Sequence, residues 1–157
     1  ADAVLLMLSV LDDAQYQQLA ALAHRLNMTV LTEVSNEDET LRAVALKAEL
    51  IGINNRDLRT LDTNLETSFK LARLIPKGIT IVSESGIYSS QQVRQLAKVA
   101  DAYLVGSSLM AQADLANACR SLIRGEHKVC GLTRAEDSAA AYANGAYFGG
   151  LIFYPKN

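Results

Sequence analysis

The sequence has no tryptophan, only two cysteines and two histidines, and no large excess of charge of either sign. Aromatic residues make up 6% of the 157 residues, and so few rings argue against a surface on which nucleic-acid bases stack. A formal net charge of −2 provides no field that would recruit nucleic acid or an anionic membrane. We therefore expect neither nucleic acid nor membrane among the partners.

The scarcity of cysteine and histidine also limits the chemistry. Cys119 and Cys130 are too few for a disulfide framework, which fits a reducing cytoplasm. With His127 they resemble part of a metal site, but a fourth ligand and a C-x-x-C pair are missing, so we expect no metal. Cys119 lies inside a helical pattern and is expected to be a core thiol. His24, also on a helical pattern, is expected to be structural or exposed.

The apolar run Val4–Leu8 is far shorter than the roughly 20 residues of a membrane span. It lacks a preceding basic segment and follows Asp2, so it indicates a strand and not a signal peptide. The chain has no initiator methionine and stops just past another apolar run. Both ends are therefore expected to be cut from a longer protein.

Seven short runs rich in Val, Ile and Leu show little alternation, which predicts strands covered on both faces. The runs are Val4–Leu11, Met28–Val34, Leu50–Ile53, Ile79–Val82, Ala102–Val105, Lys128–Cys130 and Ala146–Phe153. Helical patterns lie between them, so the chain is predicted to form right-handed β-α-β units and a parallel sheet. This α/β class leaves two architectures, a doubly wound open sheet or a (βα)8 TIM barrel. A barrel needs eight strands and about 250 residues, so any barrel here would be incomplete.

Several helix boundaries are visible as capping patterns. The predicted N-terminal caps are Asp12 and Asp13, Ser35 with Asp38, Ser89 with Ser90, and Thr133 with Glu136; the predicted C-terminal stops are Gly125 and Asn144-Gly145. The apolar face predicted for the first helix consists of Tyr16, Leu19, Leu22, Ala23 and Leu26.

Three polar side chains follow consecutive predicted strands: Glu33, Asn54 and Glu84. Ligands of parallel α/β folds bind at the edge where strands end, so the three are expected to converge there. Two carboxylates and an amide suit general acid–base work and the binding of hydroxyl groups. The alternative, that each only caps a turn, is less consistent with three arriving at one edge.

Glycine turns and a thiol occur at the same edge. The turns at Gly86 and at Gly106-Ser107 are either phosphate cradles or merely tight turns, because glycine lets backbone N–H groups approach an anion closely. Cys130 precedes a glycine at a strand end, where a thiol becomes a base or a nucleophile, or else has no chemical role.

Four motifs resemble, in order and spacing, strands 5 to 8 of indole-3-glycerol phosphate synthase. They are L-T-E-V-S-N (31–36), I-G-I-N-N-R-D-L (51–58), S-E-S-G-I (83–87) and L-V-G-S-S-L-M (104–110), and the N-terminal run is similar to strand 4. The segment H-K-V-C-G-L-T (127–133) with Y-F-G-G-L-I-F-Y-P-K-N resembles the first β-α-β of phosphoribosylanthranilate isomerase. The resemblance implies strands 4–8 of one TIM barrel in residues 1–126 and the start of a second in residues 127–157.

The resemblance also implies roles. Glu33 would perform acid–base chemistry during ring closure, decarboxylation and dehydration of a carboxyphenylamino-deoxyribulose phosphate in tryptophan biosynthesis. Asn54, Glu84 and Ser85 would orient the substrate, and Arg56 would contact its anthranilate end. The phosphate would bind at Gly86, Gly106 and Ser107, and Cys130 would be the general base of the isomerase's Amadori rearrangement. No cofactor is implied.

The first three synthase strands and most of the isomerase are absent, so we expect this chain alone to have neither activity. Absent strands leave exposed sheet edges, which predict self-association or the need for a complementing fragment. A rival hypothesis is a catalytically inert half-barrel or doubly wound interaction module. It differs in having no need for Glu33, Asn54 and Glu84 to converge.

Overall fold

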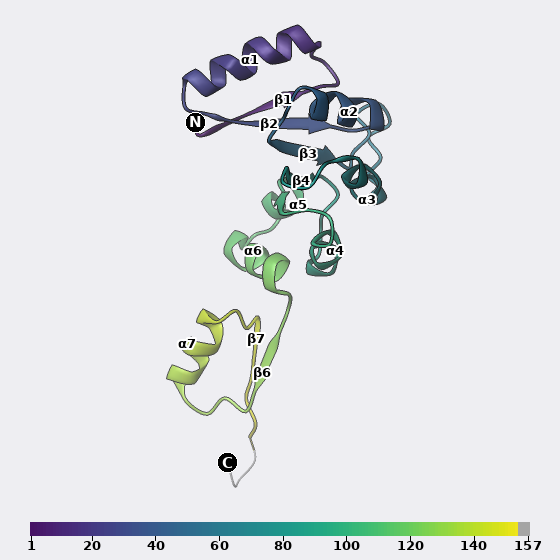
Figure 1. Ribbon diagram of the computed structural model, residues 1–157. Helices are drawn as coiled ribbons and strands as arrows, with labels where there is room; N and C mark the ends of the chain where they lie inside the picture. Colours follow the sequence, from purple (N-terminus) through teal and green to yellow (C-terminus); the bar gives the residue numbers. More distant parts are fainter. Residues whose placement is uncertain (154–157) are drawn as a thin grey trace. The chain divides into compact units, whose positions relative to one another are not determined.

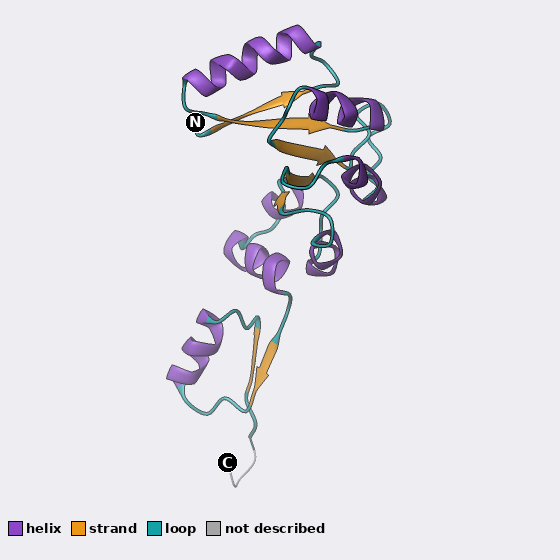
Figure 2. Ribbon diagram, viewed as in Figure 1, coloured by secondary structure: helices purple, strands orange, loops and turns teal. Residues whose placement is uncertain are grey.

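The computed structural model describes residues 1–153, in which helices and strands alternate along the chain (Figures 1 and 2). These residues form two compact units. The first comprises Ala1–Ile87 and Gln95–Val105, and the second comprises Tyr88–Arg94 and the described residues from Gly106 onward. None of the helices in the described part of the chain is both long and apolar enough to cross a membrane.

The first unit contains a five-stranded parallel sheet in the order β1-β2-β3-β4-β5. Its elements are β1 (Ala3–Met7), α1 (Asp13–Arg25), β2 (Thr29–Val34), α2 (Glu37–Ala45), β3 (Leu50–Asn54), α3 (Glu66–Leu71), the 3₁₀ turn η1 (Ala72–Leu74), β4 (Thr80–Glu84) and β5 (Ala102–Leu104). Helix α4 (Ser90–Leu96) begins in the second unit and ends in the first. The predicted α/β class and parallel sheet are confirmed. Each strand pairs with the next along the chain, without the reversal of strand order that marks a doubly wound sheet.

One face of this sheet is the core of the unit. Alternate strand residues, among them Val34, Ile51 and Ile53, are completely buried and pack in one cluster with α1, α2 and η1. Within this core the hydroxyl groups of Tyr16 and Thr32 lie 2.8 Å apart and form a hydrogen bond, so the helix-covered face leaves neither polar group unpaired.

The opposite face is more open, which differs from the prediction of strands covered on both sides. Leu5 on the first strand is 38% exposed and Leu104 on the last is 46% exposed. Both belong to the set of alternate residues that does not face the helices. In helix α1 only part of the predicted apolar face is buried. Tyr16 and Ala23 are buried, whereas Leu22 is exposed.

Some predicted boundaries were wrong. The first strand ends at Met7, not Leu11, because the backbone turns there and Met7 O accepts hydrogen bonds from Val10 N and Leu11 N. The cap of α2 is Asn36, whose side chain accepts from Glu39 N, one residue later than predicted. The N-terminal cap of α7 (Ala135–Ala143) is Arg134, whose side chain forms no capping hydrogen bond. The predicted capping box of Thr133 and Glu136 therefore does not form. The cap of α1 is Asp12, as predicted, in a capping box with Gln15.

The second unit contains α5 (Ser107–Met110), α6 (Leu115–Arg124), β6 (Lys128–Cys130), α7 and β7 (Phe148–Gly150). Strands β6 and β7 pair in parallel as a separate two-stranded sheet, so the predicted β-α-β is confirmed. The last strand is shorter than the predicted Ala146–Phe153, and residues 154–157 of the predicted second domain lie outside the described residues. Gly125 and Gly145, both with positive φ, follow α6 and α7 as predicted.

Candidate active site

The C-terminal ends of β2, β3 and β4 bring Glu33, Asn54 and Glu84 to one region of the open face. Glu33 is the register partner of Gly52, and Asn54 is the register partner of Glu84. Because parallel strands in register point equivalent side chains the same way, all three lie on the face away from the helices. They are nonetheless 7%, 7% and 3% exposed. The three polar groups that the sequence singled out are therefore neighbours, and they are shielded from solvent.

The two carboxyl groups interact directly. Burial, then the negative charge of Glu33 and a hydrogen bond with it, raise the pKa of Glu84 to about 7 from 4.5. One oxygen of Glu84, Oε1, is buried and has no hydrogen-bond partner among the described residues. A carboxyl group that holds its proton up to neutral pH can donate as well as accept hydrogen bonds, which an ionised carboxylate cannot do.

Sequence reasoning missed a buried network behind this pair. The side-chain amide of Asn55 donates to Ser83 Oγ (3.0 Å) and to the carbonyl oxygens of Glu84 (2.9 Å) and Ser85 (3.1 Å). Its Oδ1 accepts from Ser68 Oγ at 2.8 Å, and the hydroxyl groups of Ser68 and Ser83 lie 2.7 Å apart. Asn55 therefore ties the end of β4 to α3. The doubled asparagine in N-N-R-D was the available signal, since an amide at the end of an apolar strand can be buried only where its donor and acceptor groups find partners.

The backbone turns sharply directly after Glu84. Ser85 has φ 66° and Gly86 has φ 72°, so two consecutive residues adopt the left-handed conformation. Glycine accepts this conformation readily, whereas a serine does so at a cost. A strained non-glycine residue beside a buried carboxyl pair is typical of functional sites.

The predicted substrate residue Arg56 begins the loop after β3. Its backbone N–H donates to Asn54 Oδ1 at 2.9 Å, and it forms an isolated antiparallel bridge with Thr63. The single side-chain oxygen of Asn54 therefore holds the start of the loop that follows β3.

A hollow of about 620 Å³ adjoins this edge of the sheet and is lined in part by Asn54, Asp57 and Arg59. Asp57 accepts hydrogen bonds from the backbone N–H groups of Arg59 (2.8 Å) and Thr60 (3.4 Å). These bonds lower the pKa of Asp57 and identify it as a turn-forming residue.

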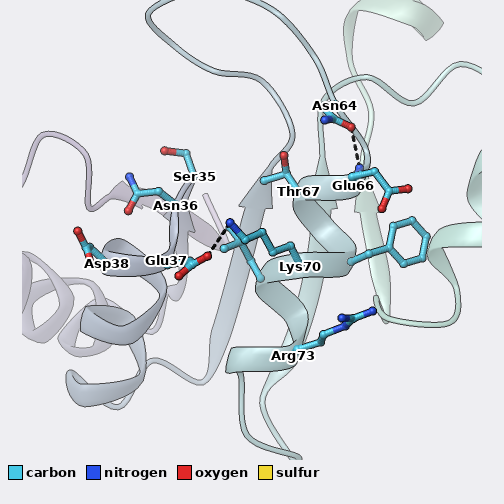
Figure 3. A pocket seen from close by; sticks show the side chains of 11 residues that line it. Ser35, Asn36, Glu37, Asp38, Asn64, Glu66, Thr67, Lys70 and Arg73 are labelled. Carbon is cyan, nitrogen blue, oxygen red and sulfur yellow. Dashed lines mark hydrogen bonds and ion pairs between the residues drawn. The ribbon is translucent and has the colours of Figure 1, made fainter.

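A second hollow, of about 640 Å³, lies between α2 and α3 and contains none of the predicted site residues (Figure 3). Glu37 and Lys70 form an ion pair of 2.6 Å across it, and Asn64 accepts from the backbone N–H of Glu66. An ion pair and a side-chain-to-backbone turn engage these groups, so this second hollow has no converging set comparable to Glu33, Asn54 and Glu84.

The remaining predicted site residues belong to the second unit. Gly106 immediately precedes α5, and a Cβ added there would meet nothing within 4 Å, which leaves room for a ligand close to the backbone. Ser107 is the first residue of that helix. Cys130 is exposed at the end of β6, and Cys119 is half-buried in α6. Across residues 1–153 there is no cluster of three or more His, Cys, Asp or Glu that could hold a metal ion.

A comparison with known protein families gives a match that covers most of the chain. Residues 1–122 match the family model described as indole-3-glycerol phosphate synthase. The chain belongs to the indole-3-glycerol phosphate synthase family. This match covers the first unit's sheet, and with it all the polar groups at the ends of β2, β3 and β4.

Two relatives extend over nearly the whole chain. The tryptophan biosynthesis protein TrpCF of Vibrio cholerae is 61% identical over 157 residues, which is 100% of this chain and 34% of that protein. The TrpCF protein of Yersinia pestis is 58% identical over 98% of this chain and 32% of its own length. The chain thus spans about a third of the length of the curated relatives that it matches.

Solved structures agree on the fold. The 3-hexulose-6-phosphate synthase of Salmonella typhimurium matches with a TM-score of 0.66 and 19% identity, over 80% of this chain and 61% of that one. The thiamine phosphate pyrophosphorylase of Pyrococcus furiosus matches with a TM-score of 0.60 and 22% identity, over 78% and 57%. Likeness to these chains and membership of the synthase family make this a TIM-barrel-like α/β fold.

Proposed function

We propose that this chain supplies part of the active site of an indole-3-glycerol phosphate synthase within a bifunctional enzyme of tryptophan biosynthesis. The substrate would be a carboxyphenylamino-deoxyribulose phosphate. The observation that carries the proposal is the buried pair Glu33 and Glu84, next to Asn54, on the open face of a sheet whose sequence belongs to this family. An inert module would have no reason to keep two interacting carboxyl groups out of water, where they cost stability.

The reaction needs protons at two stages. Ring closure joins an aromatic carbon to the ketone carbon, and the ketone oxygen takes up a proton as it becomes a hydroxyl group. The ring carboxylate then leaves as CO₂ and its bonding electrons restore the aromatic ring. The hydroxyl group leaves as water with a second proton, and the neighbouring CH₂ carbon gives up a proton as the double bond of the new ring forms. Glu33 would transfer these protons, a task that a positioned carboxyl group performs with rate gains of about 10² to 10⁴.

Glu84 would orient the substrate's hydroxyl groups. Its pKa of about 7 lets it donate a hydrogen bond near neutral pH, while its unpartnered Oε1 accepts one. Asn54 and Ser85 would bind alongside, and Arg56 would contact the anthranilate end through its guanidinium group. The turns at Gly86 and at Gly106-Ser107 would bind the phosphate. No metal or organic cofactor is required by this scheme.

The second half of the proposal concerns residues 127–157, which we assign to the start of a phosphoribosylanthranilate isomerase barrel. Its support is the separate two-stranded sheet of β6 and β7, joined by α7, and the TrpCF relatives that match along the whole chain. Cys130, exposed at a strand end, would be the base that moves a proton in the Amadori rearrangement. Residues 1–126 would then be strands 4–8 of the synthase barrel, with the open face of the sheet as the barrel interior.

An incomplete barrel also favours association. In the described part of the chain β1 and β5 each pair on one side only, and Leu22 of α1 and the following Leu26 are exposed. Unpaired edges beside apolar surface invite a second copy of the chain. Light scattering over a hundredfold range of concentration should reveal dimers or larger species, and a monomer at every concentration would contradict this assignment.

The function is best tested in a full-length relative. This chain would replace the aligned third of Vibrio cholerae TrpCF, and indole glycerol phosphate formation would be followed by fluorescence. We expect Glu33→Gln to reduce kcat at least 100-fold, and the exposed Glu49→Gln to leave it unchanged. Full activity of a correctly folded Glu33→Gln protein would refute the proposal. The 157-residue chain by itself is expected to show neither activity.

The isomerase assignment is tested separately in the same chimeric protein. Cys130→Ser should reduce the Amadori rearrangement by at least 100-fold, because a hydroxyl group is a far weaker base than a thiolate. An unchanged isomerase rate would remove Cys130 from the proposed site.

A further inference from the structure

Gly52 lies in the middle of β3, where a glycine normally weakens a strand and often marks a close approach by another group. Its neighbours along the strand, Ile51 and Ile53, are completely buried in the core on the opposite face. Nothing about the backbone demands a glycine, since Gly52 is not among the residues with positive φ. The reason for this glycine must therefore lie on the open face.

That space is occupied by Glu84. A Cβ added to Gly52 would overlap Glu84 Oε1, and it would lie 2.9 Å from Glu84 Cδ and 3.2 Å from Leu31 Cδ1. Glu84 is paired in register with Asn54, two residues further along β3. Its side chain therefore leans back along the neighbouring strand to lie over Gly52.

Glu33 is the register partner of Gly52 on the other side. Gly52 thus separates the strands that carry the two carboxyl groups and contributes no side chain between them. We infer that Gly52 is a positioning residue, whose missing side chain lets the Glu84 carboxyl group cross β3 and meet Glu33. This inference rests on the proposed function for its catalytic meaning but on geometry alone for the placement of Glu84.

The missing side chain at Gly52 explains two properties of Glu84. Its burial and the proximity of Glu33 both require the carboxyl group to lie over Gly52, and both raise its pKa. The charged group that faces Glu84 is Glu33 on β2. The register partners of Glu84 on β3 and β5 are the uncharged residues Asn54 and Leu104. Pushing the carboxyl group off Gly52 would move it towards solvent and away from Glu33.

The test is Gly52→Ala in the 157-residue chain. The atoms that a methyl group would meet are the ends of flexible side chains, so the chain is expected to fold with Glu84 displaced. With ¹³C-labelled glutamate, NMR titration of the Glu84 carboxyl carbon should show its pKa falling by about one pH unit or more. Gly149→Ala, in β7, is the matched control and should leave that titration unchanged, because its new Cβ meets only Leu132. An unchanged Glu84 titration in Gly52→Ala would overturn the inference.

Glu84→Asp separates positioning from a purely structural role. The shorter side chain no longer reaches over β3, so adding Gly52→Ala in this background should shift neither the titration of the shortened carboxyl group nor the urea midpoint further. Equal losses of stability in both backgrounds would show that Gly52 serves only the sheet, and would overturn the inference.

In the chimeric enzyme, Gly52→Ala should move the pH dependence of kcat in the same direction as the Glu84 pKa. A fixed pH profile beside a shifted titration would mean that Glu84 does not act in catalysis. That result contradicts the proposed function and leaves the positioning of Glu84 by Gly52 intact, so the two failures are distinguishable.

Discussion

The buried Glu84 makes a specific prediction about how stability depends on pH. Its pKa in the folded chain, about 7, lies above the ordinary 4.5, so the folded state binds this proton more tightly than the unfolded state. The associated stability is fully present below pH 4.5, is lost as pH rises towards 7, and is absent above that. Glu84→Gln keeps the size of the neutral acid but cannot ionise.

The magnitude follows from the two pKa values. At about 1.4 kcal/mol per pH unit, the change from 4.5 to about 7 corresponds to about 3 kcal/mol at most, and screening by the solvent next to the open face lowers the expected value to about 2–3 kcal/mol. We therefore expect the free energy of unfolding of Glu84→Gln to rise, relative to that of the native sequence, by about 2–3 kcal/mol between pH 4.5 and pH 8. Near pH 4.5 the two proteins should be almost equally stable.

The assay is urea unfolding followed by circular dichroism at several pH values, since the chain has no tryptophan to report by fluorescence. Protein concentration is held fixed because association would add to the apparent stability. Glu33→Gln should shrink the pH-dependent difference, because it removes the neighbouring negative charge. Exposed Glu49→Gln should track the native sequence. A difference between Glu84→Gln and the native chain that stays constant with pH, or falls as pH rises, would refute the reasoning.

Four further substitutions probe the scaffold of the first unit by the same unfolding assay. Asn55→Ala removes a buried amide with three donor contacts and takes one partner each from the hydroxyl groups of Ser68 and Ser83, which keep only their bond to each other, so it should cost about 2–4 kcal/mol; a loss below about 0.5 kcal/mol would show that the network is unimportant. Ser85→Gly should stabilise the chain by about 0.5–1 kcal/mol, because φ 66° is unfavourable for serine, while Gly86→Ala at φ 72° should destabilise it; the opposite signs would contradict the strained turn. Arg42→Ala should cost about 1–2 kcal/mol, because its guanidinium group bonds two main-chain carbonyl groups as well as an exposed carboxylate; no loss would mean that water replaces these bonds.

Local patterns predicted most of the secondary structure. Each of the seven apolar runs overlaps a strand, because Val, Ile and Leu in short blocks between helical patterns have few other ways to be buried. Errors arose at the ends, where backbone geometry competes with hydrophobicity. Val10 extends an apolar run but lies in a turn, and the side chain that accepts from the first turn of α2 belongs to Asn36 and not to Ser35. Helix α3 was not predicted as such, being a six-residue helix without a side-chain cap.

The sequence by itself determined the α/β class, the parallel strands, the family motifs and the three polar residues expected at one edge. These depend on residue types and their order along the chain. Tertiary structure alone decided how Glu33 and Glu84 interact, because their contact depends on strand register and on the side-chain space above Gly52. It also decided the role of Asn55, whose partners lie 13 to 30 residues away. Distances of that kind follow from how strands pack side by side, which no local pattern encodes.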